Sequence, residues 1–140
     1  IIWANYVHNI ENIIAKLKAK FGEKSTVGIY GAVSLGDRQK AVKSFQEDPD
    51  CRFFVGNPTT GGFGLTLTSA SYVVYFSSTF NLEVRQQSED RAHRIGQKED
   101  VTYIDLISPG TIDQYILRTL QSKIKLSAKT LGEDVRAFLY

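Results

Sequence analysis

The stretch RFFVGNPTTGGFGLTLTSASYVVYF, residues 52–76, decides the fold. Its two ends, residues 52–55 and 72–76, are almost wholly apolar, and a loop rich in glycine and threonine separates them. A strand buried on both faces is apolar throughout, whereas a strand with one face in water alternates apolar and polar residues. Both runs are therefore predicted to be strands of a parallel sheet that helices cover on both faces.

The rest of the chain repeats this alternation of short apolar runs and helical patterns. It predicts a three-layer α/β domain with a parallel sheet of five or six strands. Ligands of such sheets bind at the carboxyl ends of the strands, so we expect the functional site there. Ser34 is a candidate N-cap for one of the helices. Further strands are predicted at 1–4, 26–30 and 101–107, and helices at 10–17, 35–46, 82–95, from Ile112 onward and at 133–139.

The composition is that of an ordinary globular protein with one domain. Its 140 residues are 42% hydrophobic and 23% charged, and no apolar run approaches the roughly 20 residues of a membrane span. The single Cys51 excludes an internal disulfide and a multi-cysteine metal site and fits a reducing, intracellular compartment. A net charge of +2 does not by itself indicate nucleic acid. Because the chain has no Met and opens on Ile1 in an apolar run, we expect it to be part of a longer protein.

The loop after the strand at 52–55 contains three closely spaced glycines, Gly61, Gly62 and Gly64. Glycines let a backbone approach a phosphate and direct N–H groups toward it, and the neighbouring threonines add hydroxyl groups. A tight turn with positive φ, followed by a threonine-capped helix, explains the same residues equally well. On the glycines alone, both interpretations stay open.

The segment GEKST, residues 22–26, has only a superficial likeness to a P-loop. That motif requires Gly-Lys-Ser/Thr in succession after a strand, whereas here Glu23 separates Gly22 from Lys24 and the segment precedes a strand. The chain therefore contains no lysine motif of the kind that binds phosphates.

The segment QSEDRAHRIGQ, residues 87–97, is unusually polar for a helix of a globular domain. On a helix, Gln87, Arg91 and Arg94 follow one another at i, i+4 and i+7 and project from one face. The planar donors of arginine suit bidentate binding of phosphate oxygens, although a solvated charged surface is the common alternative. Gly96 is predicted to end the helix in a left-handed conformation. The packing side is assigned to Val84, Ala92 and Ile95.

These segments together resemble the second RecA-like lobe of superfamily 2 helicases, in the form carried by Swi/Snf-like ATPases and translocases. The similarity covers nearly all of the chain, in order. QSEDRAHRIGQ closely resembles motif VI and TTGGFGLTLTSASYVVYF resembles motif V. IIWANYVHNIENIIAKL is similar to the motif IV strand and helix, GIYGAVSLGDRQKAVKSFQ to the segment that follows, and VTYIDLISPGTIDQYILRTLQSK to the final strand and helix.

The resemblance implies an ATP site between two lobes, of which residues 1–140 supply the second. Arg94 would be the arginine finger that reaches the γ-phosphate, Arg91 would assist it, and Gln87 would position the nucleotide or a water. Gly64 would lie near the cleft. ATP and its Mg²⁺ would be held mainly by the N-terminal lobe of the same protein, so residues 1–140 alone are expected to be inactive.

The resemblance also implies contacts with DNA, most simply a duplex, through its backbone. Such contacts carry no sequence preference and weaken with salt. His8 and His93 are expected to have local hydrogen-bonding roles, and no metal ligands are expected in the chain. The residues implied in DNA contact are Asn5, Tyr6, Thr59, Thr60, Gly61 and Gly62.

Two departures from the family pattern count against a chromatin remodeller, and one of them, Leu82-Glu83, is more typical of the compact phage and bacterial members. Thr60 replaces the alanine found before the paired glycines of the larger remodellers, and Leu82-Glu83 stands where those proteins have a Trp-Asn-Pro turn. A phage or bacterial member would act in the cytoplasm, and a eukaryotic member in the nucleus.

Two other classes of function compete with a second motor lobe of an ATP-dependent DNA helicase or translocase. One is a degenerate RecA-like lobe that binds nucleic acid or protein without hydrolysing ATP, and the intact Gln87, Arg91 and Arg94 count against it. The other is a free-standing nucleotide-binding domain of Rossmann or flavodoxin type, for which the chain lacks a GxGxxG motif after its first strand.

Overall fold

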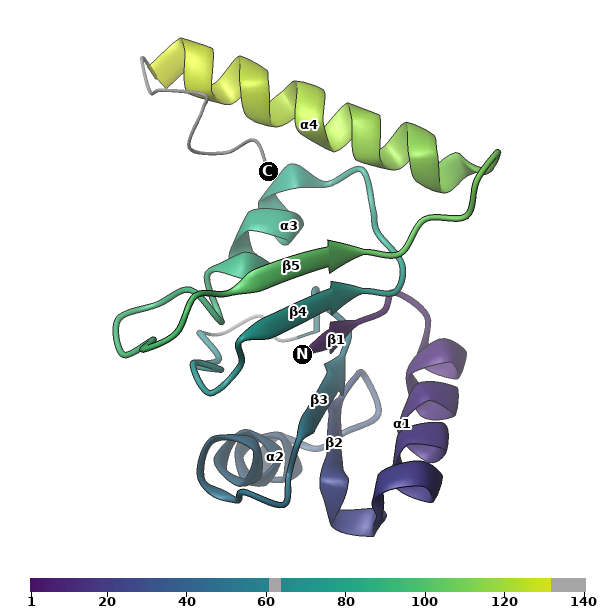
Figure 1. Cartoon of the computed structure of the whole chain (residues 1–140), viewed down its shortest axis with the longest axis vertical. Helices are drawn as coiled ribbons and strands as arrows, with labels where there is room; N and C mark the ends of the chain where they lie inside the picture. The colour runs from purple at the N-terminus through teal and green to yellow at the C-terminus, as the bar shows by residue number, and fades with distance from the viewer. Residues whose placement is uncertain (61–63, 132–140) are drawn as a thin grey trace.

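The computed structural model describes residues 1–60 and 64–131 and places a fully parallel five-stranded sheet at the centre of the protein (Figure 1). Its strands are β1 (Ile2–Trp3), β2 (Thr26–Ile29), β3 (Phe53–Gly56), β4 (Tyr72–Tyr75) and β5 (Thr102–Asp105). Across the sheet their order is β2-β3-β1-β4-β5. Ile2 is in register with Val55 of β3 on one side and with Val74 of β4 on the other. The predicted parallel sheet is confirmed, with five strands.

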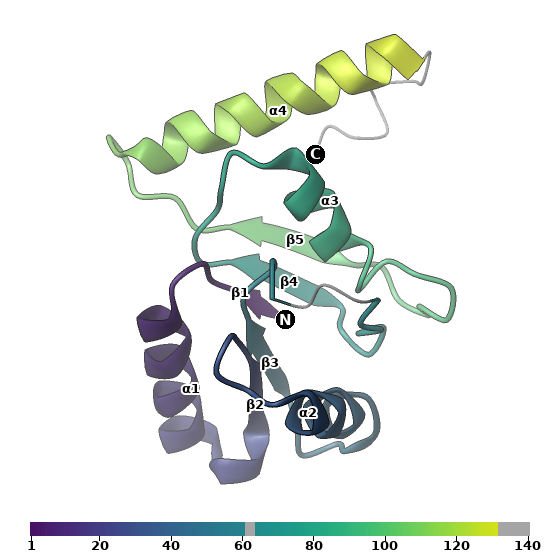
Figure 2. The same cartoon turned by 180° about the vertical axis from the view of Figure 1, so that it is seen from behind.

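Helices cover the sheet from both sides, as the strand composition predicts. They are α1 (Val7–Phe21), α2 (Leu35–Glu47), α3 (Leu82–Glu89) and α4 (Ile112–Leu131). Figure 2 shows α1 and α2 on opposite sides of β2 and β3. Ser34 caps α2 as predicted, since its side chain accepts a hydrogen bond from the Asp37 backbone N–H at 3.2 Å. The helix predicted at 133–139 lies outside the described residues, and among those described no helix is both long and apolar enough to cross a membrane.

Successive side chains along a central strand pack into two separate cores. Phe54 of β3 packs on the α2 side, where its ring centroid lies 5.5 Å from that of Phe45 and 5.8 Å from that of Trp3. Its neighbour Val55 packs on the other side against Ile10 of α1. All of these residues are buried. The continuous apolar runs of the sequence follow from this arrangement, because both faces of the strand need apolar side chains.

α3 ends at Glu89 and does not continue to residue 95 as predicted. Beyond it, the carbonyl of Arg91 accepts a hydrogen bond from the backbone N–H of Leu67 at 2.9 Å. In a continuing helix that carbonyl would accept from the residue four positions further on. Ala92 is completely buried in this turn. Packing against the loop before β4 therefore outweighs the local helical preference.

The turn after α3 also corrects the assignment of its packing side. Ala92 is buried as expected, but the side chain of Ile95 is fully exposed, at 101%. Gly96 has a positive φ of 105° as predicted, although it lies within this turn and not at the helix end.

Candidate functional site

Arg94 is fixed to the far end of the glycine-rich loop, thirty positions earlier in the sequence. Its Nη1 donates to the carbonyl oxygen of Gly64 at 3.1 Å and lies 3.4 Å from Oγ1 of Thr66. Gly64 has a φ of +50°, a conformation that favours glycine. Arg94 is exposed, and its Nε and Nη2 make no hydrogen bond within residues 1–60 and 64–131. One edge of the exposed guanidinium is thus held by the protein, and the other edge has no partner among the described residues.

Arg91 and Gln87 do not share a face with Arg94, so that part of the prediction is wrong. Arg91 is buried at 6% exposure, with its guanidinium 5.1 Å from the centroid of the Trp3 ring. Burial lowers the pKa of Arg91 from its usual value. Gln87 is exposed on α3 and donates to the Glu83 carboxylate at 3.0 Å. The one-face arrangement required a helix through residue 95, and that helix stops at Glu89.

Arg94 and Gly64 lie near the amino end of β4, not at the carboxyl ends of the strands as expected. The side chain of Gln97, at the end of the same turn, donates to the carbonyls of Ala70 at 2.8 Å and Ala92 at 3.1 Å. Ala70 precedes β4, which begins at Tyr72. The displacement arises because α3 follows the carboxyl end of β4 and leads the chain back along the sheet (Figure 1).

The second set of candidates does lie at the carboxyl ends of the strands, and Asn57 joins its members. Asn57, which follows β3, donates from Nδ2 to the carbonyl of Asn5 at 2.8 Å. Its Oδ1 accepts from the backbone N–H of Thr59 at 2.8 Å and from the Thr59 hydroxyl at 2.5 Å. The Asn5 backbone N–H in turn donates to Oγ of Ser77, beyond the end of β4, at 2.9 Å. The loops after β1, β3 and β4 thus form one bonded edge.

Arg38 of α2 holds the next residue of the loop. Its Nη1 donates to the carbonyl of Thr60 at 3.2 Å, while its Nε donates to the carbonyl of Val33 at 2.9 Å. The backbone N–H of Thr60 donates to the carbonyl of Asn57 at 3.2 Å. The Thr60 hydroxyl makes no hydrogen bond among the described residues. Within residues 1–60 and 64–131 it is thus an unused donor, whereas the hydroxyl of Thr59 is already engaged.

Of the remaining candidates for DNA contact, Tyr6 is described by the structure, whereas Gly61 and Gly62 are not. Tyr6 is 68% exposed at the start of α1, on the same edge as Asn5. Gly61 and Gly62 lie outside the described residues. His8 contacts Asn12 on α1 at 2.9 Å, a local contact as expected. Cys51 is buried, and this burial, together with the nearby Asp48, raises the pKa of its thiol.

Sequence analysis missed Asn57 and Arg38, which organise the carboxyl edge. Both act on backbone groups that lie side by side only after folding, so no local pattern marks them. An asparagine directly after a buried strand is the one available signal, because its side chain bonds nearby backbone in turns.

In the described part of the chain, neither a metal site nor one large hollow of the surface coincides with these candidates. Among the described residues, no group of three or more His, Cys, Asp or Glu side chains is placed to hold a metal ion. An open hollow of about 750 Å³ lies beside Phe45, Cys51 and Tyr72, and none of the candidate residues lines it.

Comparisons with known proteins place these segments in a family. The family model described as "Helicase conserved C-terminal domain" matches residues 1–96. The human "DNA excision repair protein ERCC-6-like" is 39% identical over 132 residues, which are 94% of this chain and 10% of that protein. The Saccharomyces cerevisiae "ATP-dependent helicase FUN30" is 32% identical over 128 residues, covering 91% of this chain and 11% of that protein.

A solved structure supports the same assignment. The crystal structure of "the C-terminal part of Fun30 ATPase domain" matches with a TM-score of 0.77 and 28% identity, over 85% of this chain and 38% of that one. The chain spans about a tenth of the length of the curated relatives it matches. These relatives come from human and yeast, so they do not support the phage or bacterial alternative. The chain belongs to the helicase conserved C-terminal domain family, as the C-terminal lobe of a Swi/Snf-type superfamily 2 ATPase.

Proposed function

We propose that the chain is the second motor lobe of a DNA-dependent ATPase and that Arg94 is its arginine finger. The observation that carries this proposal is the exposed Arg94 guanidinium, which among the described residues is held by its Nη1, at Gly64 and Thr66. Its second edge has the fork geometry that binds phosphoryl oxygens. Phosphoryl transfer depends mainly on positioning and on neutralising charge at those oxygens, which such a group provides.

Arg91 and Gln87 have supporting roles in this proposal. Arg91, buried beside Trp3, keeps the turn on the sheet so that Arg94 points outward. Gln87, exposed on α3, positions the nucleotide or the attacking water. ATP and Mg²⁺ are assigned mainly to the N-terminal lobe, because the sequence has no P-loop. Residues 1–140 alone are therefore expected to hydrolyse ATP negligibly.

The carboxyl edge is the proposed DNA-binding surface. Asn5, Tyr6, Thr59 and Thr60, together with Gly61 and Gly62, would contact the backbone of a duplex. Three residues of sequence separate Thr60 of this edge from Gly64, which binds Arg94. Action on chromatin DNA is part of this proposal, because the chain is similar to proteins such as the "Chromatin-remodeling ATPase INO80" of Candida albicans.

Replacing Arg94 in the full-length protein tests the catalytic proposal. Arg94→Ala should lower DNA-stimulated turnover about a thousandfold or more, because a finger's charge is lost from the transition state. ATP affinity, measured separately by equilibrium binding, should change little. Arg52→Ala is the matched control, since Arg52 is exposed and its guanidinium lies over the rings of Phe21 and Phe53, at 5.1 and 5.5 Å, away from Arg94.

Two outcomes would contradict the proposal. Wild-type turnover in Arg94→Ala would remove Arg94 from the reaction. A full-length protein that binds DNA but hydrolyses no ATP in its wild-type form would favour the non-hydrolysing platform.

A further inference from the structure

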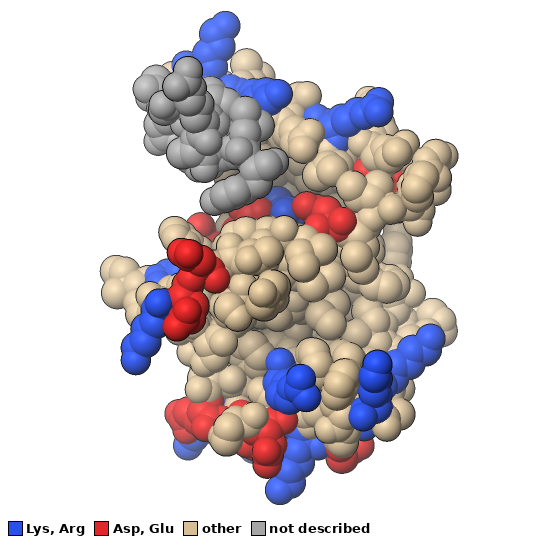
Figure 3. All heavy atoms as spheres, in the orientation of Figure 1, with Lys and Arg blue, Asp and Glu red and all other residues tan. Residues whose placement is uncertain are grey.

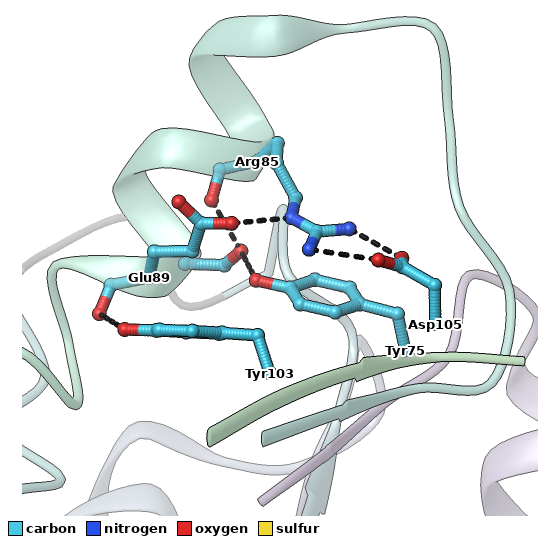
Figure 4. A network of polar contacts seen from close by, with 6 residues as sticks. Tyr75, Arg85, Glu89, Tyr103 and Asp105 are labelled. Carbon is cyan, nitrogen blue, oxygen red and sulfur yellow. Dashed lines mark hydrogen bonds and ion pairs between the residues drawn. The ribbon is translucent and has the colours of Figure 1, made fainter. Parts of the chain in front are cut away.

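Arg85 of α3 contacts side chains of two strands, β4 and β5, and one side chain of its own helix (Figure 4). Its Nη1 and Nη2 donate to the two carboxylate oxygens of Asp105, at the end of β5, at 2.5 and 3.1 Å. Its Nε donates to the carboxylate of Glu89 on α3 at 2.6 Å. Its guanidinium carbon lies 3.5 Å from the centroid of the Tyr75 ring on β4. The Arg85 side chain is only 12% exposed, so solvent screens these contacts weakly.

A second set of bonds ties the same helix to the sheet. The hydroxyls of Tyr75 and Ser88 are 2.7 Å apart, and Ser88 donates to the carbonyl of Arg85 at 2.7 Å. Because the Ser88 proton is used in that bond, Tyr75 is the donor to Ser88. The hydroxyl of Tyr103 on β5 donates to the carbonyl of Glu89 at 3.4 Å. β4 and β5 therefore each hold α3 by a tyrosine hydroxyl.

The contacts of Arg85, Tyr75 and Tyr103 hold the end of α3, and the turn that follows α3 contains Arg94. The carbonyl of Glu89, which Tyr103 holds, also accepts from the backbone N–H groups of Ala92 at 3.1 Å and His93 at 3.0 Å. Glu89 thus links the two: its side chain accepts from Arg85, and its carbonyl begins the turn that contains Arg94. A rotation of α3 about its axis would displace that turn and, with it, the arginine.

We propose that the Arg85–Asp105 pair is a positioning device for Arg94, setting the rotation of α3 on the sheet so that the exposed arginine meets the phosphate. This inference rests on the proposed function of Arg94. A bidentate arginine–carboxylate pair fixes direction as well as distance, which apolar packing does not. Buried ion pairs add little net stability compared with apolar packing. Orientation is therefore the contribution that distinguishes this pair.

The test compares Arg85→Gln, Arg94→Ala and the double variant in the full-length protein, with DNA-stimulated ATP hydrolysis as the readout. Arg85→Gln should lower kcat at least about tenfold while KM for ATP stays within about twofold, because Arg94 is misplaced and ATP is held elsewhere. The double variant should be no slower than Arg94→Ala alone, since Arg85 acts through Arg94. A purely stabilising role would lower the melting temperature and leave kcat per folded molecule unchanged.

Lys18→Gln is the control for loss of an ion pair remote from α3. Lys18 of α1 pairs with Glu23 at 2.6 Å, and its loss should leave kcat unchanged. If Arg85→Gln does not melt cooperatively, Arg85→Lys and Asp105→Asn supply the same readout, with a smaller fall in kcat expected for each.

The outcomes separate this inference from the proposed function. Folded variants of Arg85 with wild-type kcat, beside an inactive Arg94→Ala, would overturn the positioning role alone. Wild-type turnover in Arg94→Ala would overturn the proposed function, and the positioning role with it.

Discussion

Gly64 connects the glycine-rich loop to Arg94 through one carbonyl group. That carbonyl accepts from Nη1 of Arg94 at 3.1 Å, and its direction depends on the positive φ of Gly64. An alanine Cβ at this position would meet Nη1 at 3.9 Å, an ordinary contact. The requirement for glycine therefore comes from the backbone conformation and not from space.

Gly64→Ala should consequently weaken both the fold and the arginine's position. The left-handed conformation costs an L-residue about 1–2 kcal/mol, so the free energy of unfolding should fall by that amount or the loop should change its conformation. In the second case DNA-stimulated ATPase activity should fall about tenfold or more. Urea unfolding and steady-state hydrolysis measure the two effects.

Gly36→Ala is the matched control for this substitution. Gly36 lies in α2, and an added Cβ would meet nothing within 4 Å. Alanine there should raise the free energy of unfolding by up to about 1 kcal/mol and leave hydrolysis unchanged. If Gly64→Ala has the same free energy of unfolding and the same ATPase activity as Gly36→Ala, the positive φ of Gly64 is not needed for either property.

For single residues, the sequence predicts those that belong to a recognisable motif. It does not predict the residues whose side chains hold the motif's backbone in place. Arg94, Gly64 and Thr60 come from recognisable segments. Asn57 and Arg38 bind carbonyl and amide groups that only the folded sheet edge brings together. Their function depends on contacts across the fold, which no local spacing encodes.

Among the elements, the strands follow from the sequence and the end of α3 does not. A strand of a covered parallel sheet is buried on both faces, so a continuous apolar run marks it. α3 stops at Glu89 because the following turn bonds to the loop before β4, through the carbonyl of Arg91 and the N–H of Leu67. That competition between a helix and a tertiary contact is invisible to helical periodicity.

Close packing between strands and their neighbours gives a prediction on this scale. An added Cβ at Gly56 of β3 would lie 2.8 Å from the carbonyl oxygen of Ile29 in β2, and neither backbone can move without disturbing the ladder. Gly56→Ala should therefore lower the free energy of unfolding by about 2 kcal/mol, as overpacking of a rigid site does.

Gly28 of β2 provides the comparison. A Cβ there would overlap the end of the Ile14 side chain, and that flexible group can rotate away. Gly28→Ala should cost less than about 1 kcal/mol. Urea unfolding of the two variants measures both losses of free energy. A larger loss in Gly28→Ala than in Gly56→Ala would contradict the argument from the rigid strands.

In the whole molecule, the candidate residues form two sets at opposite ends of the sheet. Asn5, Thr59 and Thr60 lie at the carboxyl edge, and Arg94 lies near the amino end of β4. The rule for parallel sheets predicted functional residues at the carboxyl edge, and Arg94 departs from it. Its position was not predictable locally, because the path of α3 back along the sheet is a property of the complete fold.

The separation predicts that DNA stimulation and hydrolysis can be damaged independently. The Thr60 hydroxyl, at the carboxyl edge, has no hydrogen-bond partner among the described residues, and a hydrogen bond to a charged group is worth roughly 1.5–3 kcal/mol. In the full-length protein, Thr60→Ala should raise the DNA concentration that gives half-maximal stimulation about tenfold or more. Turnover without DNA should stay within about twofold, because Arg94 keeps its contacts with Gly64 and Thr66.

Thr119→Ala controls for the loss of a threonine hydroxyl elsewhere. Thr119 of α4 donates to the carbonyl of Tyr115 in its own helix, at 2.8 Å, and its replacement should change neither quantity. A Thr60→Ala protein that loses turnover without DNA as well would mean that the two ends act as one site. Normal stimulation at wild-type DNA concentrations would remove the Thr60 hydroxyl from the DNA contact.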